Sequence, residues 1–206
     1  MVPDESHNSD GRHIQYLSDS AKWRRLDPKL FDVLKALAPK SRSVTAIEAA
    51  GILDATFSSE KMHSAKIPAS ARDRYRTDWF KRVFSDLSHC DLVFADPDNG
   101  LVDDAEGRRR SNNFQKRIPL NEATQLARGR SAIIYHHNSR FRGGHDAEAQ
   151  HWMSQLGCDS LAIRASAYSC RTFFVVNPDP VLRQKVNEFC EIWSDYKVRL
   201  QTQSRQ

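Results

Sequence analysis

A short polar segment, Asp96-Pro97-Asp98-Asn99-Gly100, directly follows the apolar residues at 92–95. Pro fixes φ, Asp and Asn side chains bond to nearby backbone, and Gly accepts positive φ, so this composition is typical of a turn. A carboxylate at a strand end can also accept hydrogen bonds from an amine on a planar substrate, as can the carbonyl group of Pro97. The segment is therefore either a plain turn or a substrate site, and the second interpretation assigns catalysis to Asp96, Pro97, Asp98 and Asn99.

A pair of histidines, His136-His137, ends a second apolar run and is followed by Asn138, Arg140 and Arg142. Adjacent strand residues point to opposite faces, so the two imidazoles are poorly placed to bind one metal ion, and we predict no metal site. One of the pair is expected to face the cleft, with Tyr135 or His137 as the aromatic group beside a substrate. The alternative is a strand-end pair with one imidazole satisfied by hydrogen bonds.

Basic residues gather in four clusters, at 72–76, 107–110, 128–130 and 139–142, within a chain of net charge +5. A solvated surface can account for each cluster alone, but four clusters at loops and helix ends favour a polyanionic partner. We therefore predict contact with RNA or DNA through Arg76, Arg108, Arg109, His137, Arg140 and Arg142.

The elements that would position these residues follow from hydrophobic periodicity and from capping signals. We expect helices at 28–38, 75–87, 121–129, 145–156 and 181–196, strands at 91–96 and 131–136, a hairpin at 161–166 and 171–176, and weaker strands at 44–53 and 55–57. Apolar strands separated by helices predict an α/β fold with a doubly wound, mostly parallel sheet and a C-terminal antiparallel hairpin. Such sheets bind ligands at the carboxyl ends of their strands. We expect one domain over residues 1–200 and a polar tail over 201–206.

Composition excludes several classes of protein. At 206 residues and 39% hydrophobic content, the chain can bury a core, and no window approaches 18 uninterrupted apolar residues. The N-terminus lacks the basic start and apolar run of a secretory signal. Four scattered cysteines without a CxxC pair favour reduced thiols in a cytoplasmic protein.

The pair Asp96-Pro97 resembles the start of the Asp-Pro-Pro-Tyr motif that follows the fourth strand of amino-methyltransferases using S-adenosylmethionine. Asp98 and Asn99 stand where that motif has Pro and an aromatic residue. The chain is most similar to the bacterial family that methylates an adenine of large-subunit ribosomal RNA, and to relatives of that family. VPDESHNSDGRH, at 2–13, resembles its strand-end Asp and the loop with His and Gly that leads to Gly-Arg, and VVNPDP, at 175–180, resembles its strand followed by Asn-Pro-Pro.

This resemblance implies a Rossmann-like methyltransferase fold and transfer of a methyl group from S-adenosylmethionine to an exocyclic amino group of nucleic acid. Asp96 would hold the amine and Asn99 would assist. The cofactor would contact Asp4, His7, Gly11 and Arg12, and Glu60 could bind its ribose hydroxyl groups, as carboxylates at the end of a second strand commonly do. The family's first strand would lie before residue 2, so we expect either an upstream start or loss of that strand.

Two other functions remain open. The chain could be a catalytically degenerate relative that keeps the fold and binds nucleic acid without turnover. It could instead be a metal-dependent nuclease in which Asp96, Asp98 and Glu60 hold magnesium, because paired carboxylates bind this ion.

Overall fold

The computed structural model describes residues 14–39, 41, 43–62, 67–105, 107–167 and 169–203. Its contacts divide the chain into two compact units, with the boundary between Lys61 and Met62, and each unit is described here by itself. The predicted cofactor residues Asp4, His7, Gly11 and Arg12 lie outside the described residues.

The regular elements among the described residues of the first unit are all helices, and residues 51–61 form no helix or strand. The unit contains η1 (Gln15–Ser18), α1 (Ser20–Trp23), α2 (Pro28–Leu37) and α3 (Val44–Ala49). The prediction of α2 is confirmed, since Pro28 occupies its first turn and the Asp27 carboxylate accepts the Leu30 N–H at 2.9 Å. The predicted strands at 44–53 and 55–57 are wrong. The hydroxyl of Ser43 accepts the Ala46 N–H at 3.2 Å and starts α3, in which alanines favour the helix.

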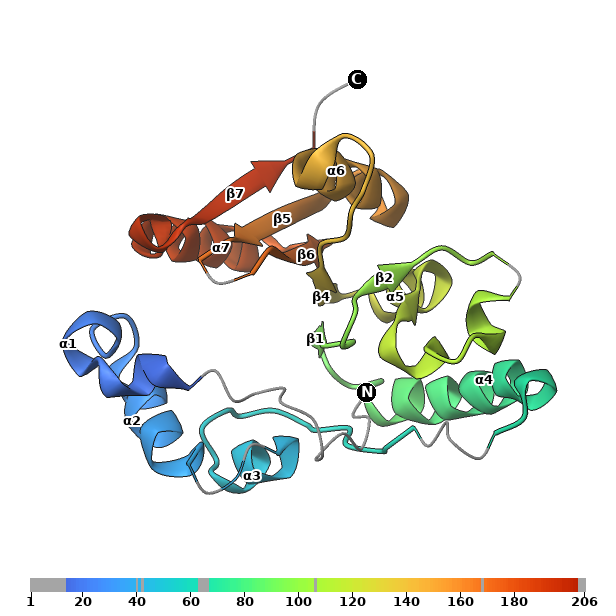
Figure 1. The fold of residues 1–206 in the computed structure, drawn as a ribbon, viewed down its shortest axis with the longest axis horizontal. Helices are drawn as coiled ribbons and strands as arrows, with labels where there is room; N and C mark the ends of the chain where they lie inside the picture. Colours follow the sequence, from blue (N-terminus) through green and yellow to red (C-terminus); the bar gives the residue numbers. More distant parts are fainter. Residues whose placement is uncertain are drawn as a thin grey trace. The chain divides into compact units, whose positions relative to one another are not determined.

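The second unit is built around a mixed five-stranded sheet (Figure 1). Its strands, in spatial order, are β1 (Leu92–Ala95), β4 (Ser131–His137), β6 (Arg171–Val176), β5 (Ser160–Ala165) and β7 (Val198–Thr202). The pair β1–β4 is parallel and the other three neighbouring pairs are antiparallel. The α/β class and the β5–β6 hairpin are confirmed.

The expectation of a mostly parallel sheet is not met. A short connection joins β5 to β6 and makes them antiparallel. Strand β6 also lies between β4 and β5, so these two strands run in the same direction without pairing with each other.

The C-terminal part of the chain differs from the predicted long helix and polar tail. Helix α7 (Pro180–Ile192) ends early, and η4 (Ser194–Tyr196) follows it. Lys197 then turns the chain with a φ of +58°. Strand β7 pairs with β5 as far as Thr202, two residues into the segment predicted to be a tail.

Helices cover both faces of the sheet (Figure 1). On one face, α4 (Ala69–Asp86), α5 (Leu120–Leu126) and α6 (Gly144–Leu156) bury residues such as Ile134 and Phe174. On the other face, α7 packs on β5, β6 and β7, and Leu161 and Val175 are buried there. The two faces alternate along each strand, as expected for β-structure. Phe94, on β1, is 59% exposed on the face that carries α7.

A second, two-stranded sheet pairs β2 (Leu101–Val102) with β3 (Ile118–Pro119) in parallel. The loop between them contains η2 (Arg108–Arg110) and η3 (Phe114–Lys116). Strand β2 begins immediately after the Asp96–Gly100 segment. Its pairing with β3 therefore holds the C-terminal end of that segment, where the Gly100 carbonyl group accepts the Ile118 N–H at 2.9 Å.

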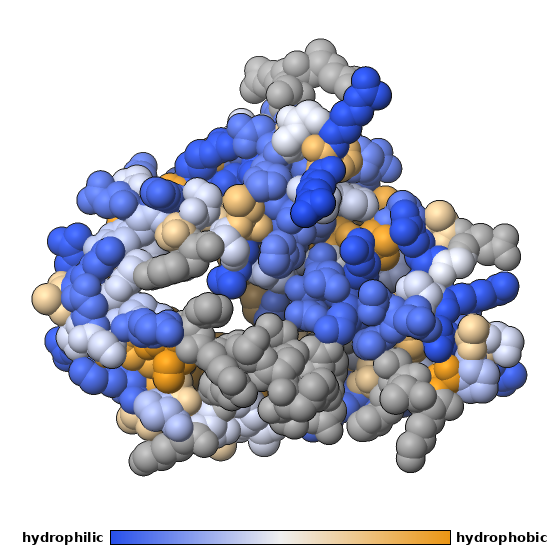
Figure 2. All heavy atoms as spheres, in the orientation of Figure 1, coloured by the Kyte–Doolittle hydropathy of each residue, from blue (hydrophilic) through white to orange (hydrophobic). Residues whose placement is uncertain are grey.

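Most described side chains visible in Figure 2 are hydrophilic, and apolar side chains appear between them in small patches. Among the described residues, no helix combines the length and apolar character needed to cross a bilayer. All four cysteines are free thiols.

Candidate substrate site at the carboxyl edge of the sheet

Strands β1 and β4 end at the same edge of the sheet because they are parallel. Ala95 pairs with Ile134, so Asp96 lies beside Tyr135 at the next position along the strands. Strand β6 begins at this edge, where Arg171 pairs with His137. The edge therefore brings together a carboxylate, a half-buried phenol, an exposed imidazole and an exposed guanidinium group. Ligands of α/β sheets bind at such edges.

Asp96 supplies the carboxylate at this edge. Its carboxylate makes no hydrogen bond or ion pair with any residue in the described part of the chain. Although the residue is exposed, the protein around the carboxylate displaces enough water to raise its pKa. Asp98 raises this pKa further, while Arg171 lowers it. A carboxylate that is partly desolvated but unpaired is a candidate functional group.

Tyr135 shares this electrostatic environment. Partial burial raises the pKa of its hydroxyl group, Arg171 lowers it, and Asp96 raises it. The ring packs edge-on against Phe173, with ring centroids 5.6 Å apart. Tyr135 is therefore an aromatic side chain next to Asp96, a role that the sequence predicted for Tyr135 or His137.

The segment after Asp96 is a closed turn. The carbonyl group of Pro97 accepts the Gly100 N–H at 3.0 Å, and the carbonyl group of Lys116 accepts the Asn99 N–H at 2.7 Å. The ammonium group of Lys116 also lies 3.1 Å from the Asp98 carboxylate. Lys116 thus neutralises Asp98, and Pro97 is buried with its carbonyl group already bonded. This leaves Asp96 and Asn99 as the predicted catalytic residues whose side chains make no hydrogen bond or ion pair with any described residue.

A buried histidine supports this turn from below. Gly100 has a φ of +80°, and a Cβ atom there would lie 2.5 Å from Nδ1 of His136. Nδ1 accepts the Leu101 N–H at 3.0 Å, and Nε2 lies 3.1 Å from Oε1 of Glu148. His136 is therefore neutral, with its proton on Nε2. Burial lowers the pKa of this imidazole, although Glu148 acts in the opposite direction.

Glu148, on α6, accepts hydrogen bonds from several surrounding donors. Its carboxylate accepts bonds from the Asn138 amide at 3.0 Å, the Ser139 N–H at 2.9 Å and the Ser139 hydroxyl at 2.6 Å. Burial acts to raise the pKa of Glu148, but the bonds from Ser139 and Asn138 outweigh it and hold the pKa below its ordinary value. The Asn138 carbonyl oxygen in turn accepts the Thr172 hydroxyl at 2.8 Å. These hydrogen bonds connect the turn to the end of β4 and to α6, and so hold the three segments in place relative to one another.

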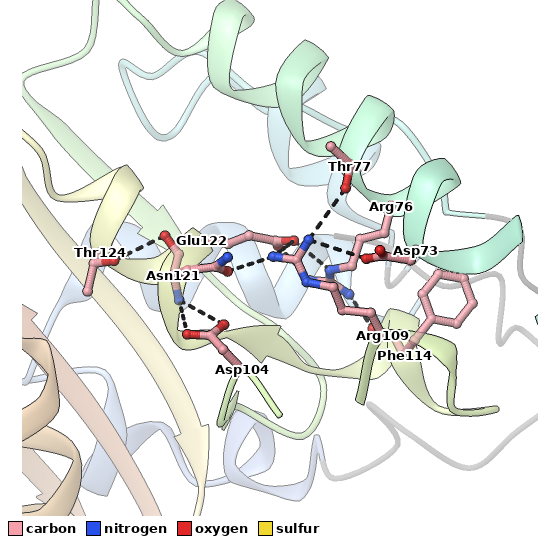
Figure 3. A network of polar contacts seen from close by, with 9 residues as sticks. All are labelled: Asp73, Arg76, Thr77, Asp104, Arg109, Phe114, Asn121, Glu122 and Thr124. Atoms are coloured by element: carbon pink, nitrogen blue, oxygen red, sulfur yellow. Dashed lines mark hydrogen bonds and ion pairs between the residues drawn. The ribbon is translucent and has the colours of Figure 1, made fainter. Parts of the chain in front are cut away.

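The predicted basic contacts fall into two groups. Arg76 is 1% exposed and forms two bonds of 2.8 Å to Glu122, so it is part of the interior (Figure 3). Arg109 bonds to Asn121 at 2.7 Å and, more weakly, to Asp73 at 3.4 Å. Arg108 is exposed and forms two bonds to Asp103.

The second group is free of such contacts. His137 ends β4, while Arg140 and Arg142 occupy the loop before α6, and all three are exposed. Neither arginine makes a hydrogen bond or ion pair within the described part of the chain. Glu60 is exposed and belongs to the first unit, whereas Asp96 belongs to the second.

Asn121 does not start α5 as predicted. It lies inside the helix, and the carboxylate of Asp104 accepts its N–H at 3.1 Å (Figure 3). Asp104 thereby satisfies a donor in the first helical turn from a distant loop, which short-range capping rules do not anticipate.

Sequence reasoning missed Lys116, Arg171, Glu122 and Glu148. A signal for the two glutamates was present, because each stands among residues of the apolar stripe of its helix, and buried carboxylates are rare unless paired. Lys116 and Arg171 had no such signal, since a basic residue in a loop or at a strand start is ordinary. Within the described ranges, no group of three or more His, Cys, Asp or Glu side chains is arranged to hold a metal ion.

No protein-family model, curated protein or solved structure matches this chain.

Proposed function

We propose that this protein transfers a methyl group to an exocyclic amino group of nucleic acid. The observation that carries the proposal is the carboxylate of Asp96, which has a raised pKa and no hydrogen bond or ion pair to a described residue, at the edge where β1 and β4 end. An aromatic side chain, Tyr135, lies at the adjacent strand position. A hydrogen-bond acceptor next to an aromatic ring suits a planar base that carries an amine.

Each residue has a defined task in this proposal. Asp96 accepts an N–H of the amine, orients the nitrogen lone pair towards the methyl donor, and can take up the proton that methylation releases. A raised pKa makes the carboxylate a better proton acceptor. Tyr135 stacks against the base, and the turn bonded to Lys116 and His136 holds Asp96 in place.

S-adenosylmethionine would supply the methyl group. The residues expected to contact it are Asp4, His7, Gly11 and Arg12, outside the described residues, and Glu60, in the first unit. Support for the proposal therefore comes from the amine-binding edge and from the resemblance of Asp96-Pro97 to the amino-methyltransferase motif.

The test combines calorimetry with S-adenosylmethionine and transfer of a labelled methyl group to RNA and DNA. Asp96→Asn should abolish transfer and keep most nucleic-acid binding, because the side chain touches the reacting group and not the phosphate backbone. The matched control is Asp195→Asn, an exposed carboxylate on η4 without a described partner, which should behave as the parent. Absence of cofactor binding, or transfer by Asp96→Asn at the parent rate, would refute the proposal.

A binding module without turnover is the second candidate, favoured by Arg140 and Arg142, whose exposed guanidinium groups have no described partner. Replacing both with Ala should weaken salt-sensitive nucleic-acid binding and leave the fold intact. Binding of nucleic acid without S-adenosylmethionine would support the module. Binding of magnesium in the same calorimeter, together with cleavage of the nucleic acid, would support the nuclease instead.

A further inference from the structure

A pocket of about 180 Å³ lies between α4 and the β2–β3 loop. Four of the nine residues that line it are arginines, and none is acidic. The polar residues of its lining are Arg76, Arg108, Arg109, Ser111, Asn113 and Arg117. A pocket lined by several guanidinium groups is suited to a phosphate, which accepts their N–H groups in a planar, often bidentate geometry.

The arginines of the pocket differ in whether they are bonded to a carboxylate. Three of its arginines each form an ion pair with a carboxylate. Arg76 pairs with Glu122, Arg108 with Asp103 and Arg109 with Asp73. The fourth, Arg117, is exposed and makes no hydrogen bond or ion pair with any described residue. Arg117 is therefore the arginine of the lining that has no bonded carboxylate among the described residues, although its charge contributes to the lowered pKa of Asp103.

The back wall of the pocket is rigid, and its rim can adapt. Arg76 and Glu122 are 1% and 2% exposed and hold each other through two bonds of 2.8 Å (Figure 3). The bond from Arg109 to Asp73 is 3.4 Å long, near the limit for a hydrogen bond. One terminal nitrogen of Arg109 can therefore turn to a ligand at little cost, while Glu122 and Asn121 keep its side chain near the pocket.

The pocket adjoins the proposed amine site along the chain. Lys116, which pairs with Asp98 and bonds to the Asn99 N–H, immediately precedes Arg117. Arg117 is also close enough to His136, beneath the turn, for its charge to lower the pKa of that imidazole. A group bound by Arg117 would therefore lie beside the turn that holds Asp96.

We propose that this pocket binds one backbone phosphate of the nucleic acid, next to the nucleotide whose base is presented to Asp96. The proposal rests on the proposed function for its choice of ligand. Arg117 supplies a guanidinium group that no described carboxylate bonds, Arg108 and Arg109 supply further N–H groups at the rim, and the Arg76–Glu122 pair fixes the wall behind them. Phosphate contacts of this kind set the register of a nucleic acid on a protein.

The experiment measures binding of a short, labelled single-stranded RNA by fluorescence anisotropy across a range of salt concentrations. Each phosphate contact contributes about 0.7 to the log–log salt slope for single strands. Arg117→Gln should reduce the slope by about 0.7 and weaken binding at low salt. Lys185→Gln is the matched control, since it removes the same charge from an exposed position on α7, outside the four basic clusters. Equal slopes for the two variants would overturn the proposal.

A second arm tests the contact from the ligand side. A neutral methylphosphonate at the linkage next to the target base should weaken binding by the parent but not by Arg117→Gln. Equal weakening in both proteins would place that phosphate elsewhere and overturn the proposal. Calorimetry with inorganic phosphate covers the other source of this ligand, because phosphate binding without RNA binding would refute a nucleic-acid partner.

The two proposals can fail separately. The slope is measured without S-adenosylmethionine, and Asp96→Asn should leave it unchanged. A reduced slope for Arg117→Gln together with no methyl transfer by the parent would keep the phosphate site and refute the methyltransferase.

Discussion

Replacing Glu148 with Gln tests the buried network beneath the Asp96 turn. The carboxylate accepts bonds from four donors, namely His136 Nε2, the Asn138 amide, and the N–H and hydroxyl groups of Ser139. Gln has the same shape, but its amide group replaces one acceptor oxygen with a donor. His136 cannot compensate by changing tautomer, because Nδ1 already accepts the Leu101 N–H. At least one buried donor is therefore left facing another donor.

The expected loss of stability is about 2–4 kcal/mol. An unsatisfied buried donor costs about 1–3 kcal/mol, and each hydrogen bond to a charged group contributes about 1.5–3 kcal/mol. These terms overlap, since relaxation around the site recovers part of each, so their sum is an upper bound. Urea unfolding monitored by circular dichroism measures the change. Glu191→Gln, on the exposed side of α7, is the control and should stay within about 0.5 kcal/mol of the parent.

The same network predicts loss of stability in acid. The pKa of His136 is lowered from 6.5, so below pH 6.5 the unfolded chain binds more protons than the folded protein. The contribution of His136 is therefore fully present above pH 6.5. It is lost as the pH falls towards the folded pKa, at up to about 1.4 kcal/mol per pH unit. Glu148, whose pKa is lowered from 4.5, adds a further loss below pH 4.5.

Hydrogen exchange at the Leu101 amide gives a local measurement of this effect. Protonation of Nδ1 removes the acceptor of that N–H, so its protection factor should fall only below pH 6.5, as the pH passes through the lowered pKa of His136. Two results would refute the reasoning: the same unfolding midpoint for Glu148→Gln and Glu191→Gln, or stability and Leu101 protection that do not change below pH 6.5.

Three further substitutions test separate parts of the second unit. Glu122→Gln leaves the buried charge of Arg76 without its partner and should cost about 3–5 kcal/mol in urea unfolding; a loss below about 1 kcal/mol would contradict the buried pair. Gly100→Ala forces a Cβ atom to within 2.5 Å of Nδ1 of His136 at a φ of +80° and should cost more than about 2 kcal/mol, so unchanged stability would exclude this close approach. Asp179→Ala removes the cap of α7 and should cost about 1 kcal/mol, measured by thermal unfolding; a Tm equal to that of the parent would argue against the cap.

Local signals in the sequence determined much of the secondary structure. Asp27-Pro28 set the start of α2, because a capping carboxylate and a fixed φ act within one turn. Apolar runs identified β1, β4 and the β5–β6 hairpin, because helices cover both faces of the sheet and neighbouring residues on opposite faces can both be buried. Asp96-Pro97-Asp98-Asn99-Gly100 was expected at a strand end, and it lies there as a turn.

Sheet topology depended on contacts between distant segments. Periodicity does not encode strand order, so the insertion of β6 between β4 and β5 and the addition of β7 could not be predicted. The helix α3 was mistaken for a strand because its short apolar stretch suits either structure, and the Ser43 cap decides between them.

The residues of the candidate site also depend partly on local sequence and partly on contacts between distant segments. The sequence alone pointed to Asp96 and to the basic clusters, because their residue types and positions are visible in the chain. Only the tertiary structure decided which of these groups are free. Burial and pairing bring together residues such as Arg76 and Glu122, 46 positions apart, and leave Arg117 and Asp96 without a hydrogen bond or ion pair to the part of the chain that the structure describes. The physical reason is that a partner supplied by the fold competes with a ligand for the same charged group, and such partners come from distant segments that no local pattern reveals.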